Sequence, residues 1–413
     1  MLEMTRPPGY RQLLALPAPR RLAIGSVPAD LSDWLDYAAV VGLLVFTWEQ
    51  GPFVLALFAL MLMLPYILVG PVLLALLHRP PIRALLIASN VGRAVTTAGL
   101  IVVADTTALL VLVFLRSSID SVFAPVRQSA IQATTPDELL TPANGLHQAI
   151  NQASKIAGPA LGGLLLGIVS PGVVFGINAA LSLLAAAIMA SVVIPPRSRA
   201  APSGTFVQRM LAGVSEMRHN HQLRLAVVFI AVAYGAFYLY DALIALLVDD
   251  FGFGSTAFGF LVAASGFGGV LGALVAGRMP RFRPLAMMGT GAGVTGVFAL
   301  GVGAAALVGL HPPLWLLLAI MVVTGAATAI MLVPYRVVVQ STVAPDRIAP
   351  VYAAGEAVSV VAMVGAPFVG STVASAWGTG AAFVAGGVVL LFLLAWTFAG
   401  HAGQRPTEAG AVR

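Results

Sequence analysis

Ionisable side chains are scarce in this chain, and several of them interrupt long apolar segments. Asp33 and Asp36 lie in one such segment, and Asp241 lies deep in another. Arg116 and Asp120 stand four residues apart in a third. An ionised group inside an apolar membrane helix costs about 2.5–3.5 kcal/mol on insertion scales, so groups that persist there are candidates for a function. The chemistry expected of them is proton uptake and release.

Asp33 and Asp36 have two interpretations. They lie three residues apart, on one face of a helix and close to its cytoplasmic end. In the first interpretation Asp33 is a proton or cation site. In the second, both are interfacial and pair with Arg20, Arg21 or a neighbouring loop. Arg93 also lies within an apolar segment, and a partner such as Asp33 or Asp36 is a hypothesis.

Aromatic residues surround the acid of the second half. Tyr234, Phe237 and Tyr238 precede Asp241 within one apolar segment. This pattern indicates a polar cavity wall with an aromatic lining, which would favour bulky lipophilic molecules. Asp241 is a second candidate for protonation.

Three further groups complete the ionisable set. Arg116 and Asp120 are spaced i, i+4 and can pair with each other for structural reasons, although a buried pair near a translocation path can also switch. Glu356 has no basic residue nearer in sequence than Arg347, so it is a candidate for protonation. Lys155 is expected to extend its ammonium group to the cytoplasmic surface.

The composition identifies the elements that must position these groups. Of the 413 residues, 59% are apolar and only 9% are charged, and the mean hydropathy is +0.96. A soluble domain has about 25% charged residues, so an ordinary cytosolic enzyme is excluded. The chain has no Cys, which removes disulfides, thiolate metal sites and cysteine catalysis. The sequence therefore predicts an integral membrane protein that crosses the bilayer several times.

A spanning helix needs about 20 mainly apolar residues, and this length predicts twelve of them. They are expected at 22–47, 53–77, 83–104, 107–132, 146–169, 173–194, 222–248, 255–277, 284–308, 313–341, 350–375 and 379–400.

The positions of the basic residues predict the orientation. All but three of the 22 Lys and Arg residues lie in the termini, in the even-numbered loops or at the helix ends beside those loops. The positive-inside rule then places both termini in the cytoplasm. This distribution explains the net charge of +6 without nucleic-acid binding.

The two halves of the chain are similar to each other. Pro159 and Gly162 recur as Pro367 and Gly370, with an offset of 208 residues. A repeat of half the chain indicates duplication of a six-helix unit. We therefore expect cytoplasmic ends at 1–21 and 401–413, six-helix bundles at 22–194 and 222–400, and a cytoplasmic linker at 195–221.

Three stretches resemble a known family. Helix 5 reads KIAGPALGG (Lys155 to Gly163), similar to the antiporter motif of the major facilitator superfamily. FAPVRQSAIQATTPDELLTPANGLHQAI (Phe123 to Ile150) and LSDWLDYAA (Leu31 to Ala39) resemble its macrolide-efflux and enterobactin-exporter branch, with Ser32 where Gly is usual. The resemblance implies an all-α fold of two six-helix bundles related as parallel repeats.

The antiporter-like motif has a packing role. Pro159 removes a backbone hydrogen bond and kinks its helix, while Gly158, Gly162 and Gly163 allow a second helix to approach closely. We expect its partner to be a smooth face of helix 8, formed by Gly266, Gly268, Gly269 and Gly272. The resemblance implies that this contact seals the outer side of the transporter.

The loop between helices 2 and 3 departs from the family pattern. Gly70, Arg79 and Arg83 fit it, but His78 stands where the family has an Asp that latches the cytoplasmic gate. The equivalent second-half loop, 272–283, also lacks the Asp. This departure supports an alternative in which the chain senses or scaffolds instead of pumping.

The function predicted from these observations is export of small amphipathic or aromatic molecules by alternating access, driven by proton antiport. The alternatives are a dedicated siderophore or secondary-metabolite exporter, and the non-pumping sensor or scaffold. The expected partners are a small-molecule substrate, protons and the lipid bilayer of the cell membrane, and the expected state is a monomer. No enzymatic activity, cofactor, metal site or nucleic acid is predicted, since no carboxylate, His or Ser constellation has catalytic spacing.

Overall fold

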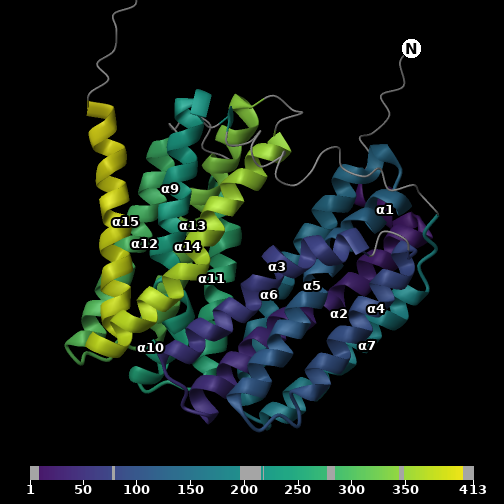
Figure 1. Ribbon diagram of the computed structural model, residues 1–413, viewed down its shortest axis with the longest axis horizontal. Helices are drawn as coiled ribbons and strands as arrows, with labels where there is room; N and C mark the ends of the chain where they lie inside the picture. The colour runs from purple at the N-terminus through teal and green to yellow at the C-terminus, as the bar shows by residue number, and fades with distance from the viewer. Residues whose placement is uncertain are drawn as a thin grey trace, which may run out of the picture. The chain divides into compact units, whose positions relative to one another are not determined.

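The computed structural model describes residues 9–76, 80–195, 215–216, 218–276, 284–343 and 348–402, and over these residues it contains helices and no strands (Figure 1). Two compact units emerge from the contacts within the chain. The first comprises Met1–Pro202 and Ile244–Gly266, and the second comprises Ser203–Leu243 and Phe267–Arg413.

The first unit holds the helices of the N-terminal half and two segments from beyond it. Its helices are α1 (Tyr10–Ala15), α2 (Pro17–Gly42) with the π turn η1 (Leu43–Thr47), α3 (Pro52–Leu76), α4 (Ile82–Gly99), α5 (Thr106–Thr134), the short η2 (Asp137–Leu139), α6 (Leu140–Leu166), α7 (Pro171–Ala190), α10 (Ile244–Asp250) and the first part of α11 (Ser255–Ala276).

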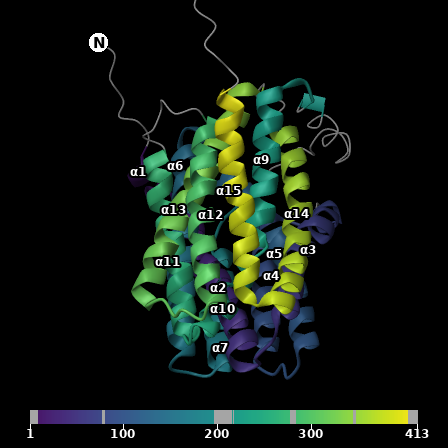
Figure 2. The same ribbon diagram turned by 90° about the vertical axis from the view of Figure 1, so that its left-hand side faces the viewer.

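The second unit holds the rest of α11 and, apart from α10, the other helices of the C-terminal half. These are α9 (His221–Tyr238), the short η3 (Asp241–Leu243), α12 (Pro284–Leu307), α13 (Leu314–Thr342), α14 (Ile348–Trp377) and α15 (Thr379–Ala402). Helices α12 and α15 lie side by side along their lengths (Figure 2).

Local sequence explains where several helices begin. Asp105 caps α5 by accepting a hydrogen bond from Ala108 N at 2.8 Å, and Asn220 caps α9 in the same way. Pro171 opens α7 at its first position, where the missing N–H costs nothing. Between α14 and α15 the chain turns at Gly378, whose φ of +88° is unfavourable for other residues.

Nine helical segments of the described residues are long and apolar enough to cross a bilayer. Helices α2, α4 and α6 fall outside this set although they lie in expected spans. Large apolar side chains such as those of Leu68, Val102 and Trp315 are exposed, which suits contact with lipid. The protein is therefore a multi-pass membrane protein, while the count of twelve stays a prediction.

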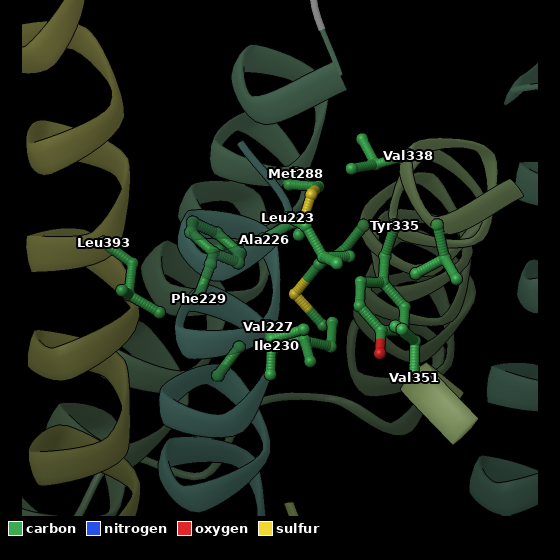
Figure 3. Packing of buried hydrophobic residues seen from close by; sticks show 14 of the residues in the cluster. Leu223, Ala226, Val227, Phe229, Ile230, Met288, Tyr335, Val338, Val351 and Leu393 are labelled. Atoms are coloured by element: carbon green, nitrogen blue, oxygen red, sulfur yellow. The ribbon is translucent and has the colours of Figure 1, made fainter. Parts of the chain in front are cut away.

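Buried apolar side chains form a core in each unit. In the second unit Phe229, Met288, Val351 and Leu393 bring together α9, α12, α14 and α15 (Figure 3). In the first unit a corresponding core joins α2, α4, α5 and α7, and Leu13 ties the short α1 to it. Each core fixes the helices that carry the polar residues described next.

One expected span is interrupted. The segment 222–248 was expected to be continuous, but α9 ends at Tyr238 and the chain passes through η3 before α10 begins. A Cβ on Gly370 of α14 would overlap the carbonyl oxygen of Leu239, the residue that follows α9. The glycine therefore lets α14 pack directly against the backbone at this break.

Candidate functional site

Helix α2 presents three aspartates along one face. Asp30, Asp33 and Asp36 follow one another at intervals of three residues, so their side chains share the face that meets α4, α5 and α7. Asp30 and Asp36 are buried, whereas the side chain of Asp33 is 34% exposed. Asp33 is thus the most accessible of the three.

Arg93 of α4 crosses to this face although it is fully buried. It forms an ion pair with Asp33, and its Nε lies 2.9 Å from Oδ1 of Asp120 on α5. The guanidinium also donates to the carbonyl of Ala29 at 2.9 Å and lies 5.0 Å from the ring centre of Phe123. A buried guanidinium needs such partners, although Nε of Arg93 and Oδ1 of Asp120 are close without forming a hydrogen bond.

Arg116 of α5 is the second cation of the cluster. Its Nε lies 2.6 Å from Oδ2 of Asp36 and its Nη2 lies 3.0 Å from Oδ1 of Asp33. The i, i+4 pair that was expected between Arg116 and Asp120 does not form, because each residue reaches a different helix. Asp33 is therefore shared between Arg93 and Arg116.

A third ion pair closes the cluster at one end. Arg127 of α5 pairs with Asp30, whose side chain is 1% exposed. At the other end Asn178 of α7 donates to Oδ1 of Asp36 at 2.9 Å. The cluster thus runs along two turns of α2 and joins four helices.

The charges of the cluster do not balance when every group is ionised. The four acids are Asp30, Asp33, Asp36 and Asp120, and the three cations are Arg93, Arg116 and Arg127. Asp30 pairs with Arg127 alone. Asp36 pairs with Arg116 and Asp120 pairs with Arg93, and each of these two arginines also contacts Asp33. Since a buried net charge is costly, one proton on the cluster would remove its excess negative charge.

Comparison with known proteins identifies the family of this helical architecture. The model of the Major Facilitator Superfamily matches residues 22–296 and 226–412. The chain belongs to this superfamily. It is 26% identical over 379 residues to the uncharacterized MFS-type transporter YfiS of Bacillus subtilis (strain 168), covering 88% of each chain.

Solved structures share the fold at low sequence identity. The nucleoside transporter NupG is 16% identical with a TM-score of 0.74, over 93% of this chain and 99% of that one. A bacterial homologue of the human lysosomal transporter Spinster is 16% identical with a TM-score of 0.72, over 93% and 97%. The POT family transporter PepTSo is 12% identical with a TM-score of 0.70, over 94% and 99%. The protein is thus a membrane transporter of the MFS type.

Sequence reasoning located part of the transporter's charged cluster and missed the rest. It selected Asp33, Arg116 and Asp120 and hypothesised the pairing of Arg93 with Asp33, which the structure contains. Asp30 was missed, and so was the pairing role of Arg127. The signal for Asp30 was available, because it extends the spacing of Asp33 and Asp36 by one more step of three residues.

The expected aromatic group of the transporter's second half is present in the second unit. The rings of Tyr234 and Tyr238 lie 6.2 Å apart, and those of Phe237 and Tyr238 lie 5.5 Å apart at 90°. Asp241 follows them in η3, at the break described above. Glu356 belongs to α14, but its side chain lies outside the described residues.

The glycines of the antiporter-like motif serve two contacts of the transporter. Gly158 and Gly162 pack on α2, where an added Cβ would lie 2.5 Å from Trp34 Cβ and 3.0 Å from Ala38 Cβ. Gly163 faces α11, where a Cβ would lie 2.8 Å from the Cα of Gly259.

The helix 8 partner of this motif was predicted only in part. In α11, Gly266 does lie near Ile156 of α6, but Gly268 and Gly272 pack on the backbone of α13 instead. The motif meets Gly259, one turn into α11. Lys155, expected at the surface, places its Nζ 5.2 Å from the ring centre of Trp34.

The predicted gate residues are described in part. A Cβ on Gly70 would lie 3.0 Å from Oγ of Ser121, and Arg83 donates to the carbonyl oxygen of Ala190 at the end of α7. His78 and Arg79 lie outside the described residues. Pro367 lies within α14, as Pro159 lies within α6.

Proposed function

We propose that this transporter exports small amphipathic or aromatic molecules in exchange for protons. It would act in the plasma membrane with both termini in the cytoplasm, as the distribution of Lys and Arg indicates. The export direction follows from the resemblance of its motifs to the macrolide-efflux and enterobactin-exporter branch. The proton coupling follows from the charged cluster of the first unit.

A single observation carries the coupling proposal, namely the position of Asp33 between two arginines. Asp36 and Asp120 are both largely buried and lie within 3 Å of Arg116 and Arg93 respectively. Asp33 contacts both arginines and is the most exposed acid of the cluster. It can take up the proton that neutralises the cluster while the two dedicated pairs persist.

Protonation of Asp33 would change what holds three helices together. The ionised carboxylate attracts Arg93 of α4 and Arg116 of α5 toward α2, and the neutral acid loses this attraction. A ligand or proton shifts a conformational equilibrium by its difference in affinity for the two states. Asp33 would couple proton movement to transport if one conformation exposes its carboxyl group to the proton source and the other conformation strengthens its contacts with the two arginines.

Other titratable groups lie near the charged cluster and must be considered when the proton site is tested. Tyr66 of α3 interacts with Asp120 and Arg116, and His147 of α6 interacts with Arg127. The remaining neighbours are Asp30, Asp36 and Arg93, described above. Asp241 of the second unit, and Glu356, remain further candidates for protonation.

Aromatic side chains would provide the substrate contacts. Tyr234, Phe237 and Tyr238 offer large apolar faces, and the two tyrosines add polar hydroxyl groups, a combination that suits amphipathic molecules. This role is proposed for the second unit and does not depend on Asp33. The two units would thus divide coupling and substrate binding between them.

The direct test is transport in everted membrane vesicles. A panel of dyes and drugs is supplied with an imposed proton gradient, and uptake is compared with and without a protonophore. We expect gradient-driven uptake that Asp33→Asn abolishes, while gradient-independent substrate exchange survives. The control is Asp105→Asn, which removes a charge from the exposed cap of α5 but preserves capping.

The other outcomes identify the alternatives. Transport limited to one chemical class, such as siderophores, would indicate a dedicated exporter. Binding without flux across the panel would favour a sensor or scaffold. Gradient-driven transport that persists in Asp33→Asn would reject Asp33 as the coupling residue and direct attention to Asp241 and Glu356.

A further inference from the structure

A cavity of about 540 Å³ lies between α5 and α6 of the first unit. Two matching stripes line it, Ala124, Arg127, Gln128 and Ile131 on α5 and Asn144, His147, Gln148 and Asn151 on α6. Each stripe follows the spacing of one helical face. Gly145 also belongs to the lining, and a Cβ on it would lie 3.0 Å from the hydroxyl of Tyr10 on α1.

Polar groups without negative charge dominate this cavity. Four carboxamides line it, from Gln128, Asn144, Gln148 and Asn151, and none of its lining residues, all of them described, is Asp or Glu. One mutual bond uses part of this capacity, since Gln128 Nε2 donates to Asn144 Oδ1 at 2.9 Å. Each carboxamide offers both donors and an acceptor, and the one charged residue of this fully described lining is Arg127, so the cavity suits a ligand that lacks positive charge.

His147 is a buried polar residue of this lining. The residue is only 7% exposed, and its Nδ1 has no hydrogen-bond partner among the described residues. A buried polar atom without a partner is costly, and native structures contain few of them. Nδ1 itself has almost no exposed surface, so a ligand in the cavity meets the rest of the imidazole ring, which belongs to the lining.

Arg127 gives the cavity its charge. Its guanidinium has five N–H donors, one nitrogen bonds Asp30, and the group lies 5.2 Å from the ring centre of Phe123. The side chain is 15% exposed, so part of the guanidinium faces the cavity. Arginine binds carboxylates well because its planar donors match the two oxygens.

We propose that this cavity binds the carboxylate of small amphipathic organic acids, with Arg127, His147 and the carboxamides around the carboxylate and the apolar body against Ala124 and Ile131. The volume lies in the range of sites for drug-sized molecules, about 300–1,000 Å³. That these acids are also exported rests on the function proposed above. The binding itself does not.

The test measures binding to the full-length transporter in lipid nanodiscs, without a gradient. Three probes share one skeleton and differ in charge, namely phenylbutyrate, phenylbutanamide and phenylbutylamine. We expect the carboxylate to bind about tenfold tighter than the amide, and the amine to bind most weakly. Equal affinities, or tighter binding of the amine, would overturn the proposal.

A matched pair of variants assigns the site. Gln148→Glu places a negative charge in the cavity and is expected to weaken phenylbutyrate binding by about tenfold or more. Gln152→Glu makes the same change one turn further along α6, outside the lining, and is expected to bind as the parent does. Equal effects of the two variants, or no effect of Gln148→Glu, would reject this cavity as the site.

A neutral variant and a transport assay complete the design. Gln148→Leu removes one donor without adding charge and is expected to weaken phenylbutyrate binding by a few-fold, which keeps the test available if Gln148→Glu misfolds. Export from vesicles is then measured separately. Selective binding without export would contradict the proposed function and leave the binding site standing.

Discussion

Nε of Arg116 lies 2.6 Å from Oδ2 of Asp36, and both side chains are buried between α5 and α2. The pair joins residues 80 positions apart, and Asn178 of α7 donates to the same carboxyl group. Such an arrangement fixes the position of α2 against two helices at once. Each of the two buried charges is also stabilised by the other, so a single unpaired charge would be costly.

Removal of one partner should therefore destabilise the fold more than removal of both. Arg116→Gln leaves Asp36 buried without its main cation, and we expect a loss of about 3–5 kcal/mol in the free energy of unfolding. The double variant Arg116→Gln, Asp36→Asn should recover part of this loss. Unfolding of the purified transporter in mixed micelles measures both effects.

The control for this pair is an exposed arginine of the second unit. Arg224 donates to the backbone of Arg218 in an exposed position, so Arg224→Gln should change stability by less than about 1 kcal/mol. Additive losses in the Arg116, Asp36 double variant would contradict a direct coupling between the two residues.

A second prediction concerns the contact of α6 with α11. A Cβ on Gly163 would lie 2.8 Å from the Cα and the carbonyl oxygen of two α11 residues, Gly259 and Ser255. Backbone cannot move aside as a side chain can, so Gly163→Ala should cost about 1–3 kcal/mol of stability. The thermal midpoint in detergent measures this loss.

The control for that prediction is a glycine with open surroundings. No atom lies within 4 Å of a Cβ built on Gly301 of α12, and alanine favours a helix over glycine by about 1 kcal/mol. Gly301→Ala should therefore leave the midpoint unchanged or raise it. A Gly163→Ala transporter as stable as the parent would show that the two helices do not pack this closely.

A third prediction tests the break between α9 and α10. Gly370 of α14 packs on the carbonyl of Leu239, and an alanine there should force the two backbones apart at a cost of about 1–3 kcal/mol. Gly365 belongs to the same helix and has nothing within 4 Å of an added Cβ. A loss of stability in Gly370→Ala that is absent in Gly365→Ala would support the packing at the break, and equal behaviour would contradict it.

The fold class could be predicted from the sequence because membrane insertion depends on composition and length. Apolar runs of about 20 residues and the spacing of turn residues determine where helices begin and end. The break near Leu239 was not predicted, and α14 packs against it through Gly370, which is distant in sequence. Hydropathy treats 222–248 as one apolar run and has no information on the helix that packs against it.

Part of the charged cluster was predictable from the sequence, whereas most of its pairings were not. The cost of charge in an apolar helix singles out Asp33, Arg116 and Asp120 from sequence alone. Their partners depend on how α2, α4 and α5 face one another, and the nearest partner in sequence was the wrong one for Arg116. The cavity lined by His147 was missed for the same reason, since it forms only when the stripes of two helices meet.

The last prediction concerns the carbonyl end of α7, where two arginines from other helices converge. Nη1 of Arg21 on α2 donates to the carbonyl of Ser191 at 2.8 Å, and Arg83 of α4 donates to that of Ala190. The last carbonyls of a helix have no partner within it and carry partial negative charge. Arg21→Ala should therefore lower the free energy of unfolding by about 0.5–1.5 kcal/mol, and adding Arg83→Ala should increase this loss.

The control is Arg20→Ala, which alters the exposed neighbour of Arg21 and should leave the thermal midpoint near that of the parent. Similar midpoints for Arg21→Ala and Arg20→Ala would show that these donors do not stabilise the end of α7.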